Sequence, residues 1–188
     1  MCSSISLTRA RVASASSPAL AVEVEAVIRE VLCTPRDADM VAGDVVEMRR
    51  AVAAEKGDRA RWDLKNAAGG LVDIEFIAQY LELVHAAAEP TILNPSTARV
   101  LERAARLGIL SVEDAEVLRP AERLYQDLGQ ILRLCLTGPF ELKSAGGSLL
   151  SLLARAADVP DFAALEAHLA ETEERVRKCF VRILGSAP

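Results

Sequence analysis

Asp37 and Asp39 are two carboxylates separated by one residue, a spacing used for magnesium-dependent nucleotidyl transfer. Such a pair holds Mg²⁺ against a triphosphate, shortly after a Gly-Ser turn that grips the phosphates. No Gly-Ser precedes this pair, which stands at an expected helix start, so we interpret it as helix-capping. Gly147-Ser148 is followed by Asp158 and Asp161 at a spacing that does not fit the same chemistry. The sequence therefore predicts no catalytic centre within this chain.

Other common catalytic and cofactor signatures are also missing from the sequence. It contains no GxxxxGKS or GxxxxGKT phosphate loop, no GxGxxG turn and no GxSxG nucleophile elbow. The two histidines, His85 and His168, form no ligand cluster with the four cysteines, so no metal site is expected. The cysteines form no CxxC motif, which favours free thiols in a reducing compartment.

Residues 65–79 carry the most informative pattern in the chain. On a helical wheel, positions 71–85 form an apolar arc of roughly 200° opposite a narrow polar stripe. Asp73 falls near the middle of the apolar arc, where an unpaired carboxylate is costly. Asp73 is therefore expected to have a partner, which is Lys65, an arginine from another helix, or backbone N–H groups at the helix start.

Two interpretations of this segment stay open at the level of sequence. In the first, Asp73 belongs to a structural ion pair or a first-turn cap. In the second, Asp73, Glu75 and Lys65 face a neighbouring domain or a ligand, and Gly69-Gly70 lets a backbone approach a helix N-terminus suited to anions.

The elements that must position these residues are helical almost throughout, and no convincing alternating strand occurs. We predict an all-α bundle of about six to seven helices. The helix carrying Leu20, Val24, Val27, Ile28 and Val31 on one face comes first, and a kink or early break is expected at Pro120. The predicted helices run from Ser17-Pro18 to Thr34-Pro35, Asp37 to Gly57, about Leu71 to Ala87, Asn94-Pro95 to Gly108, Ser111 to about Leu136, Leu149 to Ala157, and Asp161 through Ile183.

Composition and charge exclude several classes of function. The chain has 188 residues, enough for one core, and a net charge of −5 without a basic stripe, so nucleic-acid binding is not expected. No stretch of 18 apolar residues and no signal peptide is recognisable, so we expect a cytoplasmic protein that does not enter a membrane.

The motif in residues 65–79 resembles one that marks the helical domain following the nucleotidyltransferase domain in glutamine synthetase adenylyltransferase. The similarity extends over about residues 7–185, including residues 7–11, 62–65, 94–97, 107–110 and 161–166, and is to the C-terminal helical domain. Residues 1–6 are interpreted as an extraneous or disordered N-terminus, and residues 7–188 as one helical domain. The motif positions are Lys65, Gly69, Gly70, Asp73, Ile74, Glu75, Phe76 and Gln79.

The resemblance implies a function only for the longer protein. The family's enzyme transfers AMP from ATP, with Mg²⁺, to a tyrosine of glutamine synthetase, controlling nitrogen assimilation under the PII signal protein and glutamine. Its catalytic carboxylates would lie upstream of residue 1, so this chain alone is expected to bind no cofactor and to be inactive. The helical domain would pack against the upstream domain, and its separation would expose an apolar patch.

The family motif suggests which residues face the catalytic domain. Lys65, Asp73 and Glu75 are predicted there, with Arg9 and Arg11 as further members. By hypothesis, the lysine and arginines offset phosphate charge while the two carboxylates orient them.

Two alternatives to this function remain. One is a stand-alone helical module that binds a partner without chemistry. The other is the helical domain of a PII uridylyltransferase, which would be expected to continue into regulatory domains beyond the last helix near Gly185.

Overall fold

The computed structural model describes residues 2–57 and 60–185, and within these ranges the protein is built from α-helices and short 3-10 turns without a strand. The predicted all-α class is confirmed. The helices are α1 (Cys2–Leu7), α2 (Pro18–Leu32), α3 (Ala38–Lys56), α4 (Leu71–His85), α5 (Thr97–Arg106), α6 (Val112–Cys135), α7 (Gly147–Ala156) and α8 (Phe162–Leu184), with 3-10 turns η1 (Pro90–Ile92) and η2 (Leu142–Ser144).

Side-chain caps start four of these helices, as the sequence predicts. Each capping oxygen accepts a hydrogen bond from the backbone N–H three residues later, at 2.8–3.2 Å. The caps are Ser17, Asp37, Ser111 and Asp161. Because Asp37 caps α3, its proximity to Asp39 reflects helix initiation, and the helix-capping interpretation is confirmed.

Several details differ from the sequence-based prediction, among them the start of α7 at Gly147, two residues before the predicted Leu149. Residues 2–7 form α1, whereas the sequence predicted an extraneous or disordered N-terminus over residues 1–6, of which Met1 lies outside the described residues. Helix α5 begins at Thr97, with Ser96 as its cap, two residues later than predicted. Helix α6 is not broken at Pro120, because that residue and Glu116 are exposed and water can solvate the carbonyl that loses its donor.

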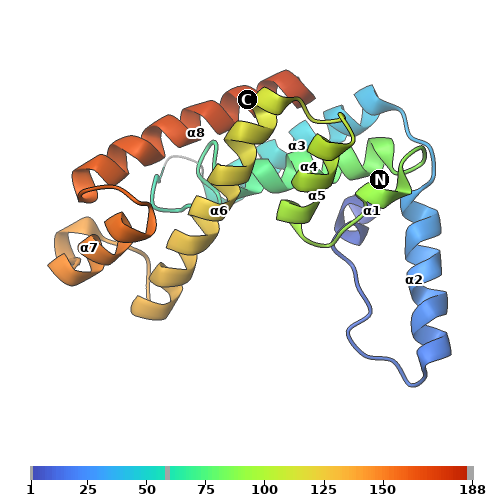
Figure 1. Cartoon of the computed structure of the whole chain (residues 1–188), viewed down its shortest axis with the longest axis horizontal. Coiled ribbons are helices and arrows are strands. Elements are labelled where there is room, and N and C mark those ends of the chain that lie inside the picture. Colours follow the sequence, from blue (N-terminus) through green and yellow to red (C-terminus); the bar gives the residue numbers. More distant parts are fainter. Residues whose placement is uncertain (1, 58–59, 186–188) are drawn as a thin grey trace.

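Helix α4 occupies the centre of the bundle and packs against α1, α3, α5, α6 and α8 (Figure 1). Ile74 and Ile77 are completely buried, and ten of its fifteen residues belong to the interior. Burial on nearly every side explains the wide apolar arc seen in its sequence. The residues on α4 are therefore positioned by contacts from several helices at once.

Helix α2 is an exception to this close packing. It stands apart at one edge of the molecule, where its packing is chiefly against α1 (Figure 1). Leu32, at its C-terminal end, is its one buried residue. Most of its predicted apolar face is exposed instead, including Leu20, Val24 and Val27. No helix in the described part of the chain is both long and apolar enough to cross a membrane.

Candidate functional site

The two adjacent glycines of the motif end a tight turn, residues 63–70, which we call the glycine turn. Asp63 holds its start by accepting hydrogen bonds from the backbone and side chain of Asn66 at 2.9–3.1 Å. The backbone of Leu71 then donates to the carbonyl of Leu64 at 3.0 Å, which closes the turn onto the first residue of α4. The turn thereby sets where α4 begins.

Gly69 is required by conformation and by contact, whereas Gly70, whose backbone is extended, is required by contact alone. Gly69 has a φ of +82°, and a Cβ there would lie 2.0 Å from the backbone oxygen of Glu173 in α8. A Cβ on Gly70 would lie 2.8 Å from the carbonyl oxygens of Leu64 and Ala67. Backbone atoms cannot yield as a flexible side chain does, so any larger residue displaces either α8 or the turn.

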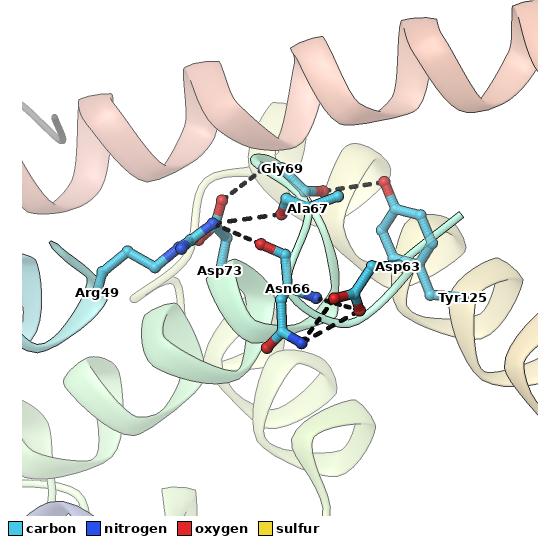
Figure 2. Close-up of polar contacts among 7 residues, drawn as sticks. All are labelled: Arg49, Asp63, Asn66, Ala67, Gly69, Asp73 and Tyr125. Carbon is cyan, nitrogen blue, oxygen red and sulfur yellow. Dashed lines mark hydrogen bonds and ion pairs between the residues drawn. The ribbon is translucent and has the colours of Figure 1, made fainter. Parts of the chain in front are cut away.

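Asp73 is paired inside the bundle with Arg49 of α3 (Figure 2). Both side chains are 1% exposed, and Arg49 Nε donates to one carboxylate oxygen of Asp73. The other carboxylate oxygen accepts from the backbone N–H of Gly69 at 2.6 Å. Of the partners left open by the sequence, an arginine from another helix and a backbone N–H are therefore observed, and Lys65 is not: it is exposed.

Arg49 also ties α3 to the glycine turn. Its Nη2 donates to the carbonyl oxygen of Asn66 at 3.0 Å and to that of Ala67 at 3.3 Å. Sequence analysis missed Arg49, although a signal was present. It follows Val41 and Val45 at four-residue intervals, which places a charge on the apolar face of α3.

Tyr125 fastens the same turn to α6. Its hydroxyl donates to the carbonyl oxygen of Gly69 at 2.9 Å. Burial raises the pKa of Tyr125, and the negative charges of Glu173 and Asp73 raise it further, so the hydroxyl keeps its proton and remains a donor. The glycine turn thus joins α3, α4, α6 and α8.

Glu75 lies nearer the surface and pairs with the N-terminal segment. Arg9 Nη1 lies 2.9 Å from its carboxylate and donates to Thr97 Oγ1 at 3.4 Å. The guanidinium side chain is 43% exposed and that of Glu75 is 19% exposed. This ion pair joins two of the residues that the sequence predicted to face the catalytic domain, the cation Arg9 and the carboxylate Glu75. Arg11 is also exposed, whereas Gln79 is buried within the bundle.

Glu82 is a second buried carboxylate on α4 that sequence analysis did not single out. It is 2% exposed and accepts a hydrogen bond from the backbone N–H of Asn94 at 2.8 Å. Burial raises the pKa of Glu82 to about 8, although that hydrogen bond and the charges of Arg9 and Arg103 lower it in part. Glu82 holds the loop before α5 against α4.

This arrangement is suited to positioning helices rather than to reacting with a substrate. The carboxylate of Asp73 is occupied by partners from within the chain, and its side chain is 1% exposed. Among the described residues, no three His, Cys, Asp or Glu side chains group as metal ligands.

The interior location of Asp73, Gly69 and Gly70 corrects the expectation that Asp73 faces a neighbouring domain, because a side chain 1% exposed has no surface to offer. Lys65, Arg9, Arg11 and Glu75 retain accessible surface.

Fold and site together define a helical bundle module whose signature motif joins four helices. A family model described as GlnD PII-uridylyltransferase matches residues 46–184. The chain therefore belongs to that family, and its predicted similarity to glutamine synthetase adenylyltransferases is confirmed by individual relatives.

Those relatives are called bifunctional glutamine synthetase adenylyltransferase/adenylyl-removing enzyme. The protein of Rhodopseudomonas palustris strain BisB5 is 58% identical over 181 residues, covering 96% of this chain. That of Bradyrhizobium sp. strain BTAi1 is 56% identical over 180 residues, again 96% of the chain. That of Xanthobacter autotrophicus strain Py2 is 51% identical over 183 residues, or 97% of the chain. The chain spans only 18% of the length of each of these relatives.

Proposed function

We propose that this chain is the C-terminal helical domain of an enzyme that transfers AMP from ATP to a tyrosine of glutamine synthetase. The observation that carries the proposal is the 51–58% identity to such enzymes over nearly the whole chain. In this proposal the domain is inactive alone, works in the cytoplasm, and shapes the side of the enzyme that receives glutamine synthetase. ATP and Mg²⁺ are then bound by the catalytic domain. The one Asp-x-Asp pair of this chain, Asp37 and Asp39, starts a helix that Asp37 caps.

The motif contributes rigidity in this proposal. Because the glycine turn joins four helices through buried contacts, it fixes the surface that the domain presents to its catalytic partner. Lys65, Arg9, Arg11 and Glu75 are our candidates for contact with that partner, with Glu75 orienting Arg9 at 2.9 Å. Asp73, Gly69, Gly70 and Gln79 act from the interior. Regulation by the PII protein is part of the same proposal.

A full-length chimera tests this function. The matching segment of the Rhodopseudomonas palustris strain BisB5 enzyme is replaced by this chain, and AMP incorporation into glutamine synthetase is measured with ATP and Mg²⁺. We expect activity within about tenfold of the parent enzyme. A folded chimera without adenylylation, beside an active parent, refutes the proposal.

The family model supports a second candidate, the helical domain of a PII uridylyltransferase. Its test is the reciprocal chimera, in which this chain replaces the corresponding domain of such an enzyme. Transfer of UMP to PII by this chimera, without adenylylation by the first one, would favour the second candidate.

A further inference from the structure

Helix α2 presents an apolar stripe to solvent. Leu20, Val24 and Val27 are spaced by four and three residues, so they share one face of the helix. They are 44%, 41% and 59% exposed. We call these three residues the α2 stripe. Contiguous exposed apolar side chains of this kind mark surfaces that another structure covers.

The composition of α2 also indicates that it needs such a cover. A helix of 15 residues is marginal in water on its own, and its several β-branched residues have low helix propensity. Within the chain, α2 packs chiefly on α1, and Leu32 is its one buried residue. Packing along the α2 stripe would supply the tertiary contacts that the other described residues of the chain do not.

We propose that the α2 stripe is the docking surface for the catalytic part of the same polypeptide, an inference that rests on the proposed function. In the relatives, 18% of the length corresponds to this chain, so a large remainder is present to cover it. Helix α2 contacts α1, and α1 contacts α4, which links the α2 stripe to the helix of the signature motif. Docking there places the catalytic part beside the segment that carries Arg9.

Charge disfavours a second copy of this chain as the occupant. Glu23 and Glu30 are seven residues apart and lie along one edge of the α2 stripe. The opposite edge, with Ile28 and Leu32, is already packed against the chain. Two copies of α2 paired antiparallel would therefore bring the glutamates of each helix face to face. The matching surface is apolar with a basic border on the side of Glu23 and Glu30.

Hydrogen exchange in the full-length chimera tests the docking. Peptides covering residues 18–32 are compared between the chimera and the isolated chain, and we expect at least tenfold slower exchange in the chimera. The double variant Val24→Gln/Val27→Gln removes apolar contact while raising helix propensity, so exchange in the chimera should return to the rate of the isolated chain. Leu20→Gln provides an independent second variant.

A matched control separates docking from general surface effects. Val112→Gln/Val181→Gln changes two valines that are 72% and 41% exposed on α6 and α8, and it should leave protection of α2 intact. Equal exchange of α2 in an active chimera and in the isolated chain would overturn the docking proposal alone. An inactive, folded chimera would instead count against the proposed function. In the isolated chain, the protection of α2 from hydrogen exchange could also rise with protein concentration and be lost in the double variant. That result would assign the α2 stripe to a second copy of the chain and would also overturn the proposal.

Discussion

The pairing of Arg49 with Asp73 makes the strongest prediction about this protein. The substitution Arg49→Met keeps most of the length and apolar volume of the side chain but removes every donor. Asp73 would then keep only the N–H of Gly69, and the carbonyl oxygens of Asn66 and Ala67 would lose the guanidinium N–H, although that of Ala67 would keep the N–H of Gly70. The glycine turn would be left holding a buried, partly uncompensated charge.

The expected destabilisation follows from this burial. Both side chains are 1% exposed, so solvent screens the pair very little. Breaking a buried ion pair from one side costs about 3–5 kcal/mol of unfolding free energy, because the remaining charge stays desolvated. In a domain of this size about 1 kcal/mol corresponds to 2–4 °C in Tm, so the Tm should fall by roughly 6–20 °C.

Urea and thermal unfolding of the isolated chain, followed by circular dichroism, measure this effect. The control is Lys178→Met, which breaks the pair of Lys178 with Glu174, where both side chains are 67% exposed, and its Tm should stay unchanged within error. Combining Arg49→Met with Asp73→Asn should cost less than the sum of the single variants by about 2 kcal/mol or more. A loss below about 1 kcal/mol for Arg49→Met would refute the reasoning.

Three further substitutions test other parts of the same structure. Gly69→Ala should destabilise by at least about 2 kcal/mol more than Gly108→Ala, since both have positive φ but only Gly69 meets a backbone oxygen; urea unfolding compares them. Because the pKa of Glu82 is raised to about 8 on folding, stability should fall as pH rises from about 4.5 to 8, and Glu82→Gln should flatten that slope in denaturant titrations across this range. Tyr125→Phe should lower the free energy of unfolding by about 1–2 kcal/mol, because it removes the hydrogen bond to Gly69. Tyr80→Phe should change thermal stability less, because Tyr80 is half-buried and its hydroxyl makes no hydrogen bond to the described residues.

Local signals in the sequence predict the helices well, because each rests on a few neighbouring residues. The caps Ser17, Asp37, Ser111 and Asp161 satisfy N–H groups only three positions away, so their role can be read from adjacent letters. The early break allowed for at Pro120 does not occur, because its effect depends on whether water reaches the freed carbonyl, and that depends on which face of α6 is buried.

The exposed α2 stripe is a second case in which the sequence predicts a local pattern and not its tertiary surroundings. Periodicity identifies an apolar face on residues 18–32, and it does so correctly. Whether that face is covered by this chain depends on where α2 sits, and the structure leaves it largely open (Figure 1). An apolar pattern predicts burial against something, and it does not name the partner.

The sequence by itself determined the all-α class, the four capped helix starts, the family motif and the need of Asp73 for a partner. Each of these follows from residue types or periodicity along one continuous stretch of chain. Only the tertiary structure decided that the partner is Arg49, 24 residues earlier in the chain, that Tyr125 and the backbone of Glu173 close on Gly69, and that Lys65 stays outside. The physical reason is that the charge on Asp73 requires compensation of a given kind, whereas the way the helices pack decides which residue can reach it.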